Sequence, residues 1–222
     1  KLNVDKAVGN FGSGREMYVY RRPGTEGVMQ GDINRDKRVD ENDLTSYMNY
    51  TGLRRGDGDF DYVAIGVNNN GLIDAYDISC VGVELDGGVR NSSDKVRGQL
   101  VLTPNVKTYK AGDVVEIKVS GKDLHYVNAL SFGLPYKADE LEYKGITLKD
   151  MKDMVNLTYD RLHTSGQKAL YPTFVNRGNN FLLEDGNPEL FTIKFVAKKA
   201  GKFNLKAVDG LLIDRNLGTV SF

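Results

Sequence analysis

The chain has 222 residues, with 30 acidic residues balanced by 30 lysines and arginines, so its formal net charge is zero. This length suits one large or two modest domains, and the lack of a basic excess or basic stripe argues against nucleic-acid binding. A single cysteine, Cys80, excludes an intrachain disulfide, and without a run of 18 apolar residues the sequence predicts no membrane-spanning helix.

Residues 1–30 are too few to form a stable domain. Two strand-like stretches, at 1–4 and 17–21, are separated by a glycine-containing turn, and two strands bury too little apolar surface to be stable alone. The Pro-Gly pair within 23–27 indicates a linker. We expect the tail of a preceding β domain, and a start at lysine rather than methionine indicates a piece of a longer chain.

An acidic loop follows at residues 32–43. Oxygen-bearing side chains stand at loop positions 1, 3, 5, 9 and 12, and with a backbone carbonyl at position 7 this spacing supplies the oxygen ligands that Ca²⁺ prefers. Lys37 stands at position 6, where glycine is usual, and a left-handed backbone there costs on the order of 1 kcal/mol. The expected ligands are Asp32, Asn34, Asp36, the carbonyl of Arg38, Asp40 and Asp43.

A second loop at residues 66–77 repeats this template 34 residues later. Position 1 is Gly66, which supplies no ligand, so we expect weaker calcium binding or an empty site, although Asp57, Asp59 and Asp61 are near enough in sequence to substitute. A plain Asx turn is the alternative for either loop, but two copies favour calcium. The expected ligands are Asn68, Asn70, the carbonyl of Leu72, Asp74 and Asp77.

Each loop is followed by an amphipathic helix, because apolar residues recur there at helical spacing. An apolar residue also stands at position 8 of each loop. Cys80 lies beside the apolar stripe of the second helix and is predicted to be a buried thiol. The apolar positions are Leu44, Tyr47 and Met48 in the first helix, Ile78, Val81 and Leu85 in the second, and Val39 and Ile73 in the loops.

Two loop-helix repeats without an entering helix make residues 31–88 resemble the dockerin family, whose repeats read Gly-Asp-x-Asn-x-Asp-Gly-x-(apolar)-(Asp/Asn)-x-x-Asp-(apolar). Residues 31–36 and 70–78 carry the resemblance. It implies a partner-binding role for loop positions 10 and 11. Because these pairs differ between the repeats, symmetric dual binding is not expected. They are Glu41 and Asn42 in the first repeat and Ala75 and Tyr76 in the second.

Residues 89–98 are polar and without periodicity, which predicts a linker, whereas residues 99–222 alternate between apolar and polar positions as half-buried strands do. About seven to nine strands between turns predict an antiparallel β-sandwich of jelly-roll type, with 149–159 as a short helix or irregular excursion. Turns are expected at 111–113, 120–122 and 200–202. The expected inward-facing positions are Val115, Ile117, Val119, Leu130, Phe132, Leu134, Tyr136, Phe191, Ile193, Phe195, Phe203, Leu205 and Ala207.

The region 99–222 resembles cohesins, the domains that receive dockerin helices on a sheet face. The stretches that carry the resemblance are 108–115, 128–136, 141–143 and 190–195, although 135–137 departs from the Tyr-Asp that is common in the family. The resemblance implies a protein-binding, scaffolding sandwich. The linker is long enough for docking within the chain as well as onto another protein, and tethering favours the former.

Catalytic signatures are missing from the sequence. Its two histidines, His125 and His163, lie in no catalytic or metal-binding spacing, and both are predicted to be structural. The alternative function is carbohydrate binding by an aromatic face of the sandwich, weakened by the absence of tryptophan and by the tendency of strand aromatics to pack against neighbours. The candidate stacking residues are Tyr126, Tyr143, Tyr159, Tyr171 and Phe174.

The expected molecule is mainly β with a small α module, divided into a tail (1–30), a dockerin-like EF-hand-like calcium module (31–88), a linker (89–98) and a cohesin-like sandwich (99–222). Residues 31–88 hold 12 acidic and 5 basic residues, so the module is acidic and the remainder of the neutral chain is basic, which favours their docking. The resemblances imply a non-catalytic accessory region of a secreted glycoside hydrolase, located extracellularly, in the periplasm or at the cell surface.

Overall fold

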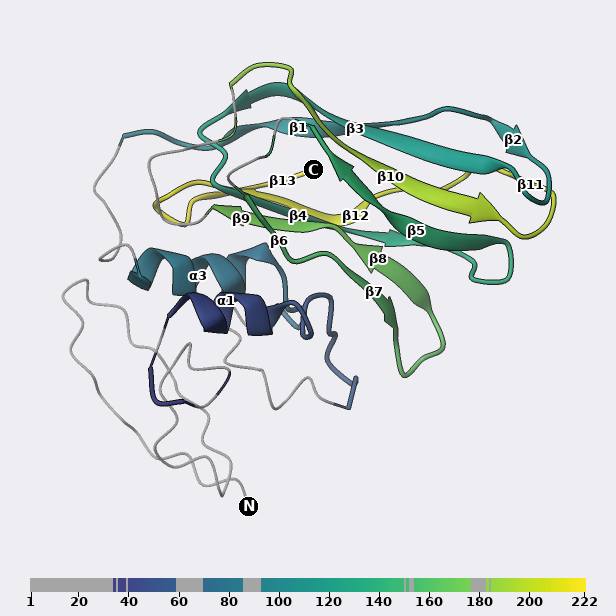
Figure 1. Cartoon of the computed structure of the whole chain (residues 1–222). Helices are drawn as coiled ribbons and strands as arrows, with labels where there is room; N and C mark the ends of the chain where they lie inside the picture. Colours follow the sequence, from purple (N-terminus) through teal and green to yellow (C-terminus); the bar gives the residue numbers. More distant parts are fainter. Residues whose placement is uncertain are drawn as a thin grey trace.

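The computed structural model describes residues 34, 36–38, 40–58, 70–85, 93–149, 151, 154–176, 183 and 185–222 (Figure 1). The predicted tail 1–30 and Val39 lie outside them. Two helices precede a series of strands along the described chain. They are α1 (Glu41–Tyr47), α3 (Ala75–Leu85), β1 (Arg97–Pro104), β2 (Thr108–Tyr109), β3 (Val114–His125), β4 (Ala129–Pro135), β5 (Leu141–Leu148), β6 (Met154–Asn156), β7 (Tyr159–Leu162), β8 (Lys168–Tyr171), β9 (Thr173–Asn176), β10 (Glu189–Ala197), β11 (Gly201–Lys202), β12 (Val208–Ile213) and β13 (Thr219–Ser221).

Most of the strands form two antiparallel sheets that pack face to face (Figure 1), and β2 pairs with β11 in a small separate sheet. One sheet has the order β1-β3-β10-β5. The other has the order β13-β12-β4-β8-β7, and β9 pairs with β4 and β6 beside this path. Pro172 separates β8 from β9, and because proline has no N–H to donate, the strand breaks there. The antiparallel β-sandwich and the mainly β class predicted from the alternation are confirmed.

One apolar core fills the space between the sheets. Successive side chains of a strand point to opposite faces, so alternate residues of β3, β4 and β10 enter this core. Phe191 packs between Phe132 and Phe174, with ring centroids 6.4 and 4.8 Å away. The predicted core positions that are buried are Val115, Ile117, Val119, Leu130, Phe132, Leu134, Tyr136, Phe191, Ile193 and Phe195.

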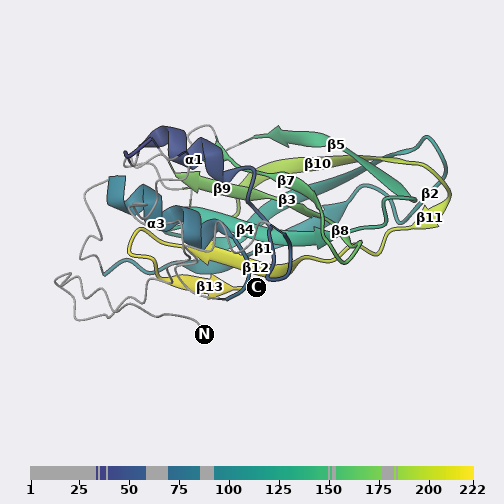
Figure 2. The ribbon, with the colours of Figure 1, turned by 90° about the horizontal axis from the view of Figure 1, so that it is seen from below.

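The second sheet is also covered on its outer face. Strands β4 and β9 are buried at almost every residue rather than at alternate ones, and so is most of β8. Helix α3 contacts β9, β4 and β12. In the view from below, α1 and α3 lie at the end of the sandwich where β9 is labelled (Figure 2). The half-buried pattern predicted for β4 is therefore wrong, because the helical module buries the face that was expected to meet solvent.

Of the three predicted turns, only 111–113 is confirmed. Residues 120–122 lie inside β3, and 200–202 lead into β11. Gly121 lies within the strand, and its N–H donates to the carbonyl of Pro188 at 2.8 Å. A side chain does not fit at this position, because a Cβ there would overlap the side chain of Leu124. Glycine here serves a close approach rather than a turn.

Two further segments differ from the expectation. Residues 203–207 are not a strand, although Phe203, Leu205 and Ala207 still pack against the core at partly buried positions. Within 149–159, where a helix or an irregular excursion was expected, the described residues include strand β6. Strand β1 begins two residues before the predicted start of the sandwich. In the part of the chain that is described, no helix has the length and apolarity to cross a membrane.

The core between the sheets predicts that substitutions at two neighbouring residues of β10 change the free energy of unfolding by very different amounts. Ile193 is fully buried, whereas Lys194 points to solvent. Ile193→Ala should lower the free energy of unfolding by about 2–5 kcal/mol, because it leaves a cavity, and Lys194→Ala should change it by less than about 0.5 kcal/mol. Urea unfolding measures both, and equal effects would contradict this assignment of the two faces.

Candidate docking interface between the helical module and the sandwich

The described parts of the two acidic loops fold in the same way. In the first, the Asp36 carboxylate accepts the backbone N–H of Arg38 at 2.9 Å, and in the second the Asn70 side chain accepts that of Leu72 at 2.9 Å. Position 6 has positive φ in both, 70° at Lys37 and 83° at Gly71. The predicted left-handed conformation of Lys37 is thus present, and the sequence repeat is a structural repeat.

Both loops also end in equivalent helix caps. Asp40 accepts the N–H of Asn42 at 2.8 Å and donates its own N–H to Asp43 at 2.9 Å. In the second loop Asp74 accepts from Tyr76 at 2.7 Å and donates to Asp77 at 3.0 Å. Such reciprocal bonds satisfy the N–H groups that a helix start leaves without partners. Burial raises the pKa of the Asp74 carboxyl, although these hydrogen bonds oppose the effect.

The two helices and the outer face of the sheet share one apolar cluster. Ile78 and Val81 of α3 and Leu44 and Tyr47 of α1 are buried as predicted, whereas Met48 is 37% exposed, so its predicted place in the stripe is wrong. The side chain of Leu85 lies outside the described residues. The remaining members of the cluster are Leu53, Ile73 and Ala75 from the module and Ala129, Leu157, Val175 and Ile213 from the sandwich.

Small residues allow the module to approach the sheet closely. Ala75 is fully buried, and its N–H donates to the Ser131 hydroxyl of β4 at 3.2 Å. Gly52, with φ of 78°, lies directly against the ring of Tyr171, and a Cβ built there would overlap that ring. A side chain on Gly52 would therefore push the module off the sheet.

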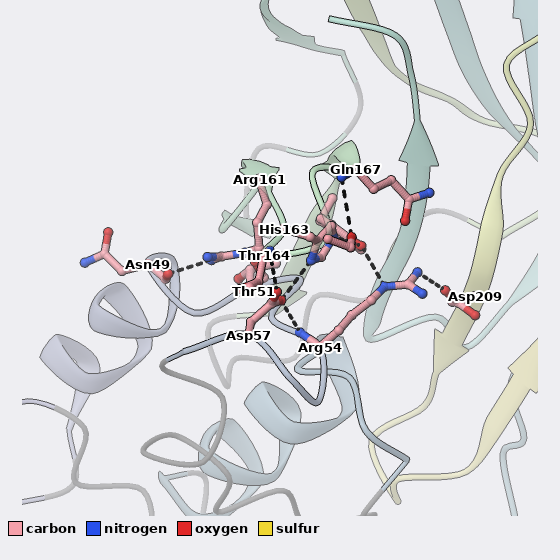
Figure 3. Close-up of polar contacts among 11 residues, drawn as sticks. Asn49, Thr51, Arg54, Asp57, Arg161, His163, Thr164, Gln167 and Asp209 are labelled. Carbon is pink, nitrogen blue, oxygen red and sulfur yellow. Dashed lines mark hydrogen bonds and ion pairs between the residues drawn. The ribbon is translucent and has the colours of Figure 1, made fainter.

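A buried polar chain crosses the interface beside these contacts (Figure 3). His163 Nδ1 lies 2.8 Å from Asp57 Oδ2, and its Nε2 lies 2.7 Å from the Tyr171 hydroxyl. Tyr171 Oη also accepts from Arg54 Nε at 3.0 Å, so its hydroxyl links the imidazole to the guanidinium. We call Asp57, His163, Tyr171 and Arg54 the polar latch.

Arg54 of the latch and Arg161 make further contacts between the module and the sandwich (Figure 3). Arg54 of the module also binds Asp209 of β12 at 2.6 Å. Arg161 of β7 reaches in the opposite direction and donates to the backbone carbonyls of Thr51 and Asn49, at 2.9 and 2.6 Å. These carbonyls follow the end of α1, where a cation is favoured by the helix dipole and by acceptors without intrahelical partners.

The latch holds Asp57 in its charged form. Burial alone would raise the pKa of this carboxyl, but hydrogen bonds from the Arg54 N–H, His163 and the Thr164 N–H outweigh it and lower the pKa to about 2. Burial raises the pKa of Tyr171, so its phenol stays protonated at neutral pH. The charged carboxylate therefore stabilises the docked arrangement at neutral pH.

Some of the predicted site residues lie at this interface and others lie away from it. Among the partner-binding positions, Ala75 and Tyr76 lie at it, while Glu41 and Asn42 are exposed away from it. Asp57, one of three carboxylates near enough in sequence to substitute for the ligand missing at Gly66, pairs with His163 instead. Of the expected calcium ligands, Asp32 and Asn68 lie outside the described residues. Asp59 and Asp61, the other two carboxylates near enough in sequence to substitute, also lie outside them.

Several other expectations are corrected. Tyr171 and Phe174 are 3% and 0% exposed, so they cannot form the predicted sugar-stacking face. The thiol of Cys80 is half-buried rather than buried. His125 pairs with Asp185 at 3.0 Å near the surface. His163 is buried and structural, as predicted, but sequence reasoning did not find its partner Asp57, which is 106 residues away in the chain.

No protein-family model matches the sequence, and no curated protein is similar to it. Solved structures of similar fold are cohesins, the family that residues 99–222 resemble. A type II cohesin from the cellulosome of Acetivibrio cellulolyticus has 11% identity and a TM-score of 0.41 over 59% of this chain and 90% of its own. A non-cellulosomal cohesin from Archaeoglobus fulgidus has 15% identity and a TM-score of 0.37 over 52% and 84%. A chain from a type I cohesin–dockerin complex of Clostridium thermocellum has 14% identity and a TM-score of 0.42 over 59% and 92%. At these TM-scores none of the likenesses carries a functional inference by itself.

Proposed function

We propose that this chain is a non-catalytic assembly region in which the helical module docks on the outer sheet face of the sandwich in the same chain. The shared apolar cluster of α1, α3, β4, β9 and β12 supports this proposal most strongly. The polar latch supports it independently, because His163 pairs with Asp57 and Tyr171 with Arg54 across the interface, and polar groups paired in this way fix one orientation of the two parts.

Docking within the chain explains the composition of the outer face. An exposed sheet face usually carries polar residues at alternate positions. Here the alternate positions of β4 are Ala129, Ser131 and Gly133, which are too small to shield the sheet from water but leave room for a helix. Such a face is suited to a partner, and the tethered module is at high effective concentration.

Calcium is proposed as the stabilising ion of the module. In the structure the first-loop carboxylates accept backbone N–H groups, and among the described residues no three acidic, histidine or cysteine side chains converge on a metal-sized site. The donor set still fits Ca²⁺ in chemistry, because all its ligands are oxygens and the backbone is left-handed at position 6. When bound, the ion would neutralise the negative charge of the loop carboxylates. Its holders would be Asn34, Asp36, the carbonyl of Arg38, Asp40 and Asp43, with Asp32 completing the loop.

The family resemblances extend the proposal beyond this chain. Dockerin-like and cohesin-like segments side by side favour an accessory region of a secreted polysaccharide-degrading enzyme, and a cohesin-like domain on another protein is the alternative partner of the module. The solved cohesin of Clostridium thermocellum is in complex with a dockerin.

Calcium binding is tested by titration calorimetry on chelator-stripped protein. We expect one ion in the first loop and a weaker second one. Asp36→Ala removes an exposed first-loop ligand and should weaken the tighter site at least tenfold. Asp94→Ala removes an exposed carboxylate outside both loops and should leave binding unchanged. Absence of calcium-dependent heat, or equal behaviour of the two variants, would reject calcium as the stabilising ion.

Docking is tested by adding a single methyl group at Gly52. Gly52→Ala places a Cβ in the Tyr171 ring and should loosen the module, so backbone amides of α3 should exchange with solvent at least tenfold faster while those of β3 and β10 stay protected. Gly56→Ala is the matched control. It carries similar backbone strain, with φ of 101°, but has no atoms near its Cβ. Equal exchange in the two variants would mean that Tyr171 does not seat the module.

The latch predicts a dependence on pH. Because the pKa of Asp57 is lowered to about 2 in the folded chain, its stabilisation is complete above about pH 4 and is lost as the pH falls toward 2. Asp57→Asn should lower the unfolding free energy by about 2 kcal/mol at pH 7, and this difference should shrink near pH 2. Asp139→Asn, which removes an exposed ion pair with Lys199, should have little effect. A difference for Asp57→Asn that is the same at both pH values would contradict the charged role of Asp57.

A further inference from the structure

A groove of about 750 Å³ runs along the junction of the module and the sandwich. Its floor is the outer face of β12 and β13, with Leu211, Thr219 and Ser221. One wall is the second acidic loop, from Asn70 to Tyr76, and the Arg54–Asp209 ion pair lies at its margin. This volume lies within the range of small-molecule sites, roughly 300–1,000 Å³.

The groove is a composite that only the docked arrangement completes. The floor comes from the sandwich and the wall from the module, so neither part has the site alone. The sheet is also shaped for it: the pairing of β12 with β4 shifts between Val208 and Leu211, and Asp209 within this bulge has φ of 52°. Bulges re-aim side chains next to functional sites, and this one directs Asp209 toward Arg54.

The lining mixes polar and apolar residues and carries little net charge. Asp209 is neutralised by Arg54, the one cation of the lining, and Asp74 is 5% exposed, with its oxygens already bonded to Asn70 and Tyr76. A phosphate or other anion would thus meet no uncommitted positive charge. Apart from the calcium ion proposed for the second loop, a cation would meet an Asp209 carboxylate that is already paired. The charge balance favours a neutral ligand.

The remaining groups match a ligand rich in hydroxyls. Thr219 and Ser221 present hydroxyls that both donate and accept, and the Arg54 guanidinium and the Asp209 carboxylate add further donors and acceptors. Tyr76 and Phe222 are half-buried rings that line the groove and offer apolar surface to the C–H groups of a sugar ring. We propose that this groove binds a short neutral glycan, at a site separate from the aromatic face considered from the sequence.

The site rests on the proposed docking, because the module supplies its wall. The test uses the intact chain with calcium, and cellohexaose, xylohexaose and mannohexaose are titrated separately by calorimetry. We expect at least one to bind. Thr219→Tyr fills the groove and should weaken that binding at least tenfold, whereas Thr147→Tyr, an exposed threonine of β5 in the other sheet, should leave it unchanged.

Undocking supplies the second arm of the experiment. Gly52→Ala, checked by amide exchange, should lose glycan binding together with docking. Retained binding in an undocked Gly52→Ala chain would place the site on the sandwich alone and overturn the proposal. It would also be overturned if none of the three hexasaccharides bound, or if Thr219→Tyr bound as wild type does. If Gly52→Ala stayed docked, the Gly52–Tyr171 contact would not be what seats the module, and the Thr219→Tyr comparison would still test the groove.

Discussion

The double burial of strand β4 is the constraint on which the rest of the structure depends. One face of the strand meets the core between the sheets, and the other carries small residues such as Ala129 and Ser131 that only a covering element can shield from water. Helix α3 provides this cover with Ile78 and Val81. The helices are short, with seven and eleven residues, and helices of that length are marginal in isolation. Module and sheet face therefore stabilise each other.

Apolar burial alone does not fix how the module lies on the sheet, because the hydrophobic effect has no direction. The polar latch supplies the direction. His163 has a 3% exposed side chain, and its Nδ1 meets Asp57 across the interface while Tyr171 accepts from Arg54 of the module. A shifted module would leave these groups without partners, at a cost of about 1–3 kcal/mol for each buried group. Arg161 adds a second anchor on the carbonyls behind α1. The same orientation brings the second acidic loop beside β12 and β13, where it forms the wall of the groove.

Local patterns predicted much of this architecture, and long-range pairing decided the rest. The spacing of oxygen side chains located both loops, and the left-handed turn expected at Lys37 is present. Alternation found the core face of β3 and β10. It misjudged β4, because periodicity cannot reveal a second partner on the outer face. It missed the latch because Asp57 and His163 acquire their roles only when segments 106 residues apart meet. Gly121 was assigned to a turn because a glycine that permits close packing looks the same in sequence.

Nuclear Overhauser contacts between Gly52 and Tyr171 test docking within the chain most directly. The ring of Tyr171 lies against the Gly52 backbone, so this account predicts strong cross-peaks between the Gly52 Hα protons and the Tyr171 ring, with Hα shifts displaced by the ring current. In a mixture of labelled and unlabelled chains, isotope-filtered spectra should contain these peaks only within one chain. Absence of the cross-peaks, or their appearance only between chains, would contradict an intramolecular dock.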